Sequence, residues 1–333
     1  MQTILQKQEI SRKRNRRLVL AVAGLALLFP FLARDYNYIL NVACFIEIYI
    51  IAVSGLDIIY GYCGQISLGH AAFFAIGAYV SAMLHNYAGL PVIPCMVVAA
   101  TISALFGALI AYPASKLVFH FLSLATQAVG EIIYIFISHS PKNVTGNYVG
   151  IFTSRVTVFG FELKGYFSLF YFGLACVGIF LTAKHMIVHS HTGRAFLAIR
   201  ENTHAADGMG IDVRRYKVIA FAISTFFTGF AGAMFVHLVG YAHPDSFMYA
   251  QSVKFLTMLL FGGTGSLLGP VFGAASVMCI TEALRNFQDY MTFIYGILML
   301  LIIIAMPGGI YGEGKRLISY LAGKAGRGKV GKE

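Results

Sequence analysis

Apolar runs close to twenty residues long recur along this 333-residue chain, and no other feature of the sequence restricts its possible folds as strongly. Each run is about long enough to cross the hydrocarbon core of a bilayer as an α-helix. Only 12% of the residues are charged, whereas a water-soluble domain carries roughly 25%. We therefore predict an all-α fold, a polytopic bundle of transmembrane helices.

The apolar runs predict about ten membrane spans. Their expected ranges are 18–34, 38–60, 63–84, 91–112, 117–138, 166–183, 217–240, 252–263, 267–285 and 290–307. The run at 252–263 is too short to cross alone, and Gly262, Gly263 and Gly265 interrupt the chain at its end. Such a break frees backbone groups that only a packed or water-lined interior can satisfy. We therefore expect glycine-broken helices in the bundle.

Three segments are rich in lysine and arginine, because residues 1–17, 184–217 and 312–333 hold six basic residues each. Basic residues concentrate in the cytoplasmic segments of membrane proteins. We therefore place a basic cytoplasmic tail at 1–17, one transmembrane domain at 18–311 with a cytoplasmic loop at 184–216, and a second basic cytoplasmic tail at 312–333. Six spans before the loop and four after it satisfy this orientation.

The net charge of +11 would suit nucleic-acid binding, but its distribution argues against that function. The two tails carry nine of these charges, which is typical of segments lying against anionic lipid headgroups. The sequence also contains no tryptophan and no recognition module. We expect the lipid bilayer as a partner and no nucleic acid.

Signatures of enzymes are absent or incomplete in the sequence. Residues 323–329 resemble a phosphate-binding loop, but Val330 stands where serine or threonine is required. The five cysteines form no CxxC pair, and no cluster of histidine, cysteine and carboxylate indicates hydrolytic chemistry. We expect no catalytic residue, no metal ion and no cofactor bound by this chain.

A glycine-punctuated segment at 61–79 places Gln65, Ser67 and His70 within an apolar stretch. Small residues let helices approach closely, and polar side chains at membrane depth face a partner or a cavity rather than lipid. Two interpretations stay open. These side chains either form interhelical hydrogen bonds that hold the bundle together, or line a translocation path.

A second glycine-punctuated segment runs from 262 to 273 and includes Gly262, Gly263 and Gly265. Its Gly262-x-x-Gly265 spacing matches Gly61-x-x-Gly64, which is weak support for an internal repeat. Broken helices at corresponding positions of two halves indicate the substrate pathway of a transporter.

The polar loop contains a segment, 191–211, that is predicted to form two short helices. The first covers 194–201, and Asn202 or Thr203 can cap the second. The residues that we expect to contact another protein are Gly193, Arg194, Arg200, Glu201, Ala205, Ala206, Gly208 and Gly210. Alanines and glycines there would form a nearly bare helix face able to dock in a groove; the alternative is an ordinary charged loop.

Several sequence blocks resemble a known family in the expected order. They are Gly-Tyr-x-Gly-Gln-x-Ser-Leu-Gly-His-Ala at 61–71, Gly-Arg-Ala-x-x-Ala-Ile-Arg-Glu at 193–201, Gly-Tyr-x-x-Pro-Asp-Ser-Phe at 240–247, Gly-Gly-x-Gly-Ser-x-x-Gly-Pro at 262–270 and Pro-x-Gly at 307–309. Together they resemble the branched-chain amino acid permeases of ATP-binding-cassette (ABC) importers, in the high-affinity LivM-type branch. In the coupling motif of such permeases, Glu-Ala-Ala-x-x-x-Gly, His204 stands in place of the glutamate.

The resemblance implies a multi-pass permease of the bacterial inner membrane that works by alternating access. It also implies a sister permease subunit, two cytoplasmic ATPase subunits that bind ATP and magnesium, and a periplasmic substrate-binding protein. Importers of urea, small amides or other amino acids share this permease type, so these substrates stay open. An ion-coupled secondary carrier is the main rival class.

Three ionisable residues, Glu47, Asp57 and Glu131, fall within predicted spans. A charge there costs several kcal/mol unless it is neutralised or paired. Asp57 departs from the family, which usually has asparagine at this position. For Glu47 a structural role is expected. For Glu131 a structural and a functional role both stay open, and it joins the residues of the glycine segments as a candidate for the translocation path.

Overall fold

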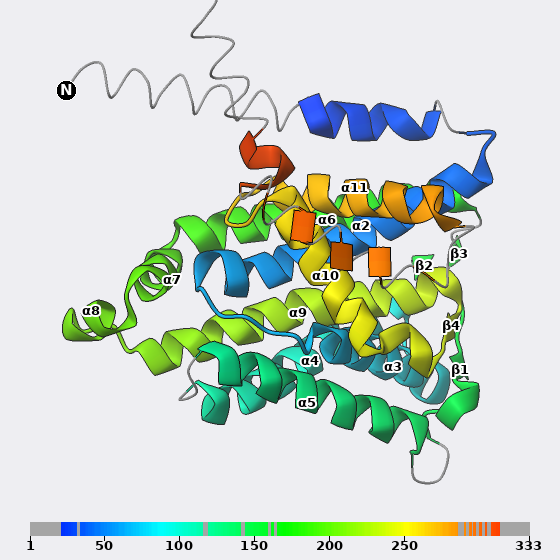
Figure 1. Ribbon diagram of the computed structural model, residues 1–333. Helices are drawn as coiled ribbons and strands as arrows, with labels where there is room; N and C mark the ends of the chain where they lie inside the picture. The colour runs from blue at the N-terminus through cyan, green and yellow to red at the C-terminus, as the bar shows by residue number, and fades with distance from the viewer. Residues whose placement is uncertain are drawn as a thin grey trace, which may run out of the picture.

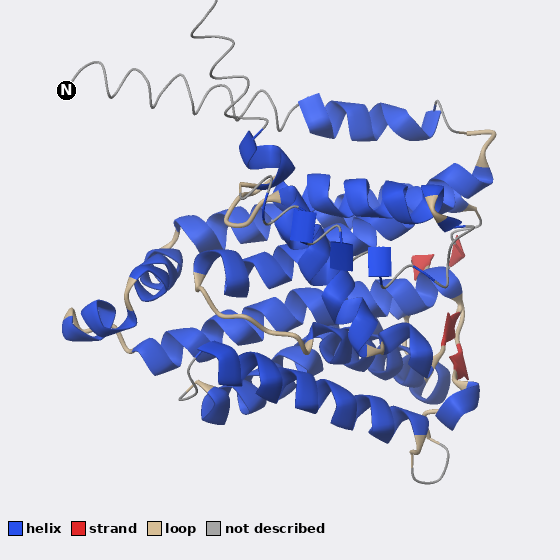
Figure 2. Cartoon of the chain, viewed as in Figure 1, coloured by secondary structure: helices blue, strands red, loops and turns tan. Residues whose placement is uncertain are grey.

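The computed structural model describes residues 21–31, 34–115, 119–140, 144–158, 161–162 and 165–285, together with some positions between 290 and 313. Within these residues the chain is a bundle of α-helices with only short strands (Figure 2), as the sequence predicts. The predicted tail at 1–17, residues 314–333 of the other tail, and most of the predicted span 290–307 lie outside the described residues.

The bundle is built from helices that differ widely in length. They are a short helix Ala21–Phe31, α2 (Asn37–Asp57) continued by a π-helical turn (Ile58–Tyr62), α3 (His70–Ala88), α4 (Val92–Ala114), α5 (Phe119–Ser138), α6 (Tyr166–His189), α7 (His191–Glu201), α8 (Thr203–Gly208), α9 (Val213–Val239), α10 (Tyr249–Gly262) and α11 (Gly269–Ala283). The 3₁₀ turns are Asn147–Val149 and Pro244–Phe247.

The two ends of the bundle carry different structures (Figure 1). Helices α7 and α8 project from one end, beyond the long helices. At the opposite end, β1 (Ile151–Phe152) pairs antiparallel with β4 (Tyr241–Ala242), and β2 (Thr157–Val158) pairs with β3 (Phe161–Glu162). The polar loop predicted at 184–216 and the connection at 139–165 therefore lie at opposite ends, as the predicted topology requires.

Helix α9 forms the centre of the bundle and packs against α2, α3 and α4. Its 27 residues extend about 40 Å at the α-helical rise, which exceeds the roughly 30 Å thickness of the bilayer core. Small residues permit the close packing: a Cβ added at Gly77 of α3 would lie 1.9 Å from the Gly229 carbonyl oxygen of α9. This small-residue contact is typical of membrane helices.

Five of the described helices are long and apolar enough to cross a membrane. They are Asn37–Tyr62, Val92–Ala114, Phe121–Ser138, Tyr166–His189 and Val213–Val239, and each overlaps a predicted span. The total of ten spans stays a prediction, because α3, α10 and α11 are shorter or less apolar and the last predicted span is largely outside the described residues.

Two predicted boundaries are wrong, and each error has a physical cause. The span predicted at 63–84 begins only at His70, since the chain from 63 to 69 is not helical and Gly64 has a left-handed φ of 72°. The span predicted at 166–183 extends to His189, so Lys184 belongs to α6 and not to the polar loop. Lys184 is fully buried, because a counter-ion holds it inside the bundle.

The break predicted near residue 262 is confirmed. Helix α10 ends at Gly262 after 14 residues, and α11 starts at Gly269. Between them Gly263 and Gly265 have φ values of 101° and 69°, which residues with side chains rarely adopt. The chain therefore turns inside the bundle at this loop.

Candidate functional site

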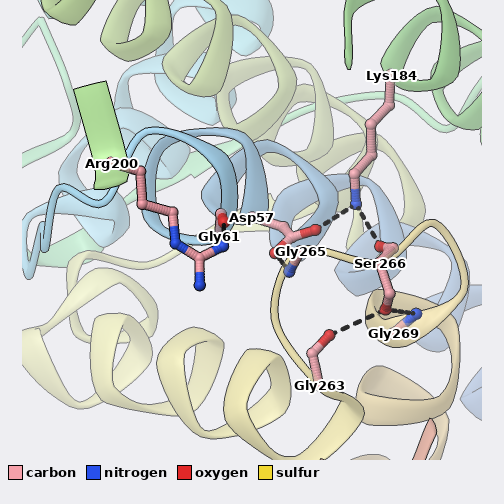
Figure 3. A network of polar contacts seen from close by, with 8 residues as sticks. All are labelled: Asp57, Gly61, Lys184, Arg200, Gly263, Gly265, Ser266 and Gly269. Atoms are coloured by element: carbon pink, nitrogen blue, oxygen red, sulfur yellow. Dashed lines mark hydrogen bonds and ion pairs between the residues drawn. The ribbon is translucent and has the colours of Figure 1, made fainter. Parts of the chain in front are cut away.

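The Asp57 carboxylate, at the last position of α2, is the centre of a buried polar network (Figure 3). One oxygen accepts a hydrogen bond from the Lys184 ammonium at 2.7 Å, and the other accepts one from the Gly265 backbone N–H at 2.7 Å. Neither ionic side chain is exposed to solvent. An unpaired charge at such a position would be strongly destabilising, so this ion pair explains how both residues are tolerated.

The Lys184 ammonium also fixes the loop between α10 and α11. It donates to the Ser266 carbonyl oxygen at 3.1 Å. The Ser266 hydroxyl donates to the Gly263 carbonyl oxygen at 3.1 Å and accepts from the Gly269 N–H at 3.0 Å (Figure 3). One lysine of α6 thus stabilises both the end of α2 and the start of α11.

The two glycine segments that the sequence analysis compared lie in contact at this network. A Cβ added at Gly61 would lie 2.0 Å from the Asp57 carboxylate and 2.5 Å from the Gly265 backbone nitrogen. Only glycine therefore fits at position 61. We call the set Asp57, Gly61, Lys184, Arg200, Gly265 and Ser266 the glycine junction.

Arg200 connects the projecting helix α7 to the glycine junction. Its guanidinium donates a hydrogen bond to the Gly61 carbonyl oxygen (Figure 3). A Cβ added at Gly64, which has positive φ, would lie 3.3 Å from the Arg200 Cα, so the backbones also approach closely. A displacement of α7 would therefore move the broken end of α2 directly.

The predicted pair of short helices in the polar loop is confirmed. The Ser190 hydroxyl caps α7 by accepting from the Gly193 N–H. The Asn202 side chain caps α8 by accepting from the backbone N–H groups of His204 and Ala205 at 3.0 and 3.1 Å. Such caps stabilise a helix by about 1 kcal/mol each, which explains how a helix as short as α8 forms.

The bare helix face expected on α8 is only partly exposed. Ala205, Gly208 and Gly210 are exposed, but Ala206 packs inward with 4% of its surface exposed. Met209 is 83% exposed beside them and was not among the predicted residues. Arg194 and Glu201 are exposed on α7, whereas Gly193 is buried at its start.

The polar residues proposed near the start of α3 lie in the core. His70 is 1% exposed, and its ring nitrogens contact the hydroxyls of Ser67 and Ser224 at 3.0 and 2.7 Å. The contact with Ser224 joins α3 to α9, which agrees with the interhelical interpretation, whereas Ser67 lies in the segment just before α3. Gln65 is also buried, and its side-chain nitrogen has no partner among the described residues.

The remaining candidates occupy separate places. Gly262, Gly263 and Gly265 belong to the loop at the glycine junction, whereas Glu131 is exposed on α5, away from it. Glu47 is buried against Gly173 of α6, and neither of its carboxylate oxygens has a partner among the described residues. The part of the chain that the structure describes contains no group of three or more metal-binding side chains.

Sequence reasoning missed Lys184 and Ser266 as members of the junction. Lys184 directly follows an apolar run and was counted as a loop charge. A signal existed, since a lone aspartate at the end of a predicted span requires a cationic partner. The Ser266 backbone carbonyl oxygen accepts the hydrogen bond from Lys184. Any residue has such a carbonyl group, so the sequence does not predict this contact.

Two comparisons with known proteins find the same family of permeases. A family model described as the permease component of a branched-chain amino acid transport system matches residues 38–306. The chain is 32% identical over 324 residues to the high-affinity branched-chain amino acid transport system permease protein LivM of Escherichia coli, covering 90% of this chain and 76% of that protein.

Other relatives are more distant. A probable branched-chain amino acid transport permease protein LivM of Methanocaldococcus jannaschii is 22% identical over 236 residues, covering 66% of this chain and 67% of that protein. The D-allose transport system permease protein AlsC of Escherichia coli is 25% identical over 251 residues, covering 73% and 71% of the two chains. No solved structure matches the chain.

Proposed function

The chain belongs to the family of permease components of branched-chain amino acid transport systems, and from this membership we propose that it is the membrane subunit of an ABC importer. In this proposal it moves branched-chain amino acids across the bacterial inner membrane by alternating access. The observation that carries the mechanism is the hydrogen bond from Arg200 of α7 to the Gly61 carbonyl oxygen.

In this proposal, helix α8 is the part of the chain that contacts an ATPase subunit. It projects from one end of the bundle (Figure 1). Ala205 and Gly208 are exposed on it, and Met209 is exposed directly after its last residue. Small side chains leave room for a groove on a partner, and one long apolar side chain can fill a pocket there. We therefore assign the contact with an ATPase subunit to α8.

Movement of α7 and α8 reaches the helix bundle through the glycine junction. Arg200 contacts the end of α2, and Asp57 connects that end to α6 and to the loop before α11. A network that joins separate elements can transmit a displacement when those elements have two discrete arrangements. The glycine-rich loops at 61–69 and 262–269 supply backbone freedom for a second arrangement.

Membership of the permease family supports the other components that we propose. Two ATPase subunits bind ATP and magnesium on the cytoplasmic side, where we place α7, α8 and the turns that join them to α6 and α9. A sister permease completes the membrane-spanning part, and a periplasmic substrate-binding protein delivers substrate to the end that carries β1 and β4. This chain itself is a transport subunit and not an enzyme.

Transport by reconstituted complexes tests the proposal. Proteoliposomes that contain this chain, its sister permease and the two ATPases should take up leucine only with ATP and the binding protein present. If the complex takes up urea or a small amide under the same conditions but no leucine, the proposed substrate is wrong and the importer carries that compound instead. If this chain alone takes up leucine when driven by a proton gradient, it is a secondary carrier and not an importer subunit. If it takes up leucine without any energy source, it is a passive channel.

A further inference from the structure

Glu131 occupies an unusual position for a charged residue. It lies in the middle of Phe121–Ser138, a helix segment long and apolar enough to span a membrane, and its side chain is exposed. In the other four described span helices, Glu47, Asp57 and Lys184 are buried, and the three basic residues of α9 lie within its first five positions. A carboxylate facing lipid at mid-span is costly, so the surface around Glu131 must face something polar.

The neighbours of Glu131 form a polar strip along α5. Gln127, Glu131 and Tyr134 are separated by four and three positions, so they lie on one helix face. The Tyr134 hydroxyl donates to the Asp245 carboxylate at 3.0 Å, which continues the strip towards the end that carries the strands. Leu124 and Ile135, seven positions before Glu131 and four positions after it, are exposed apolar side chains on its other flank. Glu131 therefore lies at the border between the polar strip and an exposed apolar surface.

The strip borders a small pocket between α5, the start of α3 and the start of α10. Leu68, Ala71, Ala72 and Phe247 supply apolar wall, and Gln127, Glu131, Tyr249 and Ser252 supply polar groups. Close packing holds the walls together, since a Cβ added at Gly69 would lie 2.2 Å from the Thr126 carbonyl oxygen. Glu131 has no hydrogen-bond or ion-pair partner among the described residues.

We infer that this pocket is a subsite on the translocation path, where the Glu131 carboxylate accepts the ammonium group of the transported amino acid. A single carboxylate stands at this pocket, which has room for about one water molecule, so in this conformation the carboxylate can meet only the ammonium group and the aliphatic side chain stays outside the pocket. A carboxylate and an ammonium form charge-assisted hydrogen bonds. Glu131 is exposed on the surface of this chain, so the proposed path runs along this face of α5.

This inference rests on the proposed function and adds the group that recognises the substrate. It first requires that Glu131 faces water. In a chain with Cys279→Ser, which removes the exposed cysteine, Glu131→Cys in the reconstituted complex should react with a membrane-impermeant thiol reagent. Ile132→Cys, at a neighbouring position that is 65% exposed, is the matched control and should react at least tenfold more slowly. Equal or absent labelling of both cysteines overturns the inference.

The second measurement compares Glu131→Gln with Glu131→Asp. Glutamine keeps the shape and removes the charge, so ATP-driven leucine uptake should fall at least tenfold while the complex assembles normally. Aspartate keeps the charge and should retain at least a third of the uptake. Wild-type uptake of Glu131→Gln, or a loss explained by failed assembly, would contradict the subsite. Absence of leucine uptake in the wild-type complex would instead contradict the proposed function.

Discussion

The Lys184 ammonium and the Asp57 carboxylate, 127 positions apart in the chain, lie 2.7 Å apart with neither side chain exposed. This ion pair joins α6 to α2 at the point where α2 ends and where the loop before α11 returns to the bundle. Because the Asp57 carboxylate also accepts a hydrogen bond from the Gly265 N–H, the ends of two helices and the loop before α11 are joined by one carboxylate. The proposed transmission of motion from α7 passes through this group.

Removing one member of the pair should destabilise the protein more than removing both. Lys184→Met leaves a buried carboxylate without its cation, which costs about 3–5 kcal/mol in buried pairs. In the double variant Asp57→Asn with Lys184→Met, the asparagine can still accept from the Gly265 N–H, and most of the stability should return. Thermal unfolding of the purified complex measures both effects. Additive losses from the two substitutions would show that the ion pair is not a unit.

Position 61 should tolerate only glycine. Gly61→Ala forces a methyl group against the Asp57 carboxylate, and overpacking of this kind costs about 1–3 kcal/mol. Gly178→Ala in α6 is the matched control, since no atom lies within 4 Å of the added Cβ. The control should leave stability and uptake unchanged. If Gly61→Ala has the same stability and uptake as Gly178→Ala, the close contacts described for Gly61 at the glycine junction are wrong.

Arg200→Lys should separate ATP hydrolysis from transport. The lysine keeps the charge but lacks the planar guanidinium that reaches the Gly61 carbonyl oxygen. We expect ATPase subunits to remain bound and leucine uptake per ATP hydrolysed to fall about tenfold, a typical size for coupling between sites. Arg215→Ala, an exposed position at the start of α9, is the control and should keep the wild-type ratio. An unchanged ratio in Arg200→Lys would remove Arg200 from the mechanism.

Two neighbouring alanines of α8 should respond differently to arginine. Ala205 is exposed, so Ala205→Arg should leave this chain folded and block binding of the ATPase subunit. Ala206 is 4% exposed, so Ala206→Arg should disrupt the loop itself and lower the yield of folded protein. Co-purification with the ATPase subunit, together with the unfolding temperature, separates the two effects. Normal co-purification of Ala205→Arg would place the contact elsewhere.

The local features of the fold were predictable because their signals are local. Ser190 and Asn202 are good helix caps, and the short helices after them are present as the loop sequence predicts. The break after Gly262 was predictable for the same reason, since an apolar run of insufficient length ended in glycines. The resemblance carried by five sequence blocks led to the family that the comparisons show.

Long-range features were harder to obtain from the sequence. Apolar periodicity placed the start of α3 seven residues early, because residues 63–69 are apolar enough for a helix but pack as an irregular segment against α7 and α5. The partner of Asp57 was missed because it lies 127 positions away. The inward orientation of Ala206 depends on how α8 packs on α9, and a stretch of small residues gives no directional signal.

The contact between α8 and the ATPase subunit is the central claim, and site-directed cross-linking tests it most directly. Met209 is 83% exposed directly after the last residue of α8, and Met209→Cys in a chain with Cys279→Ser offers one accessible thiol among the described residues. A short bifunctional reagent that joins this thiol to lysines should give a single product of this chain with one ATPase subunit. We expect that product in the assembled transporter. An intact assembly without the product, or with Met209→Cys joined to the periplasmic binding protein instead, would contradict it.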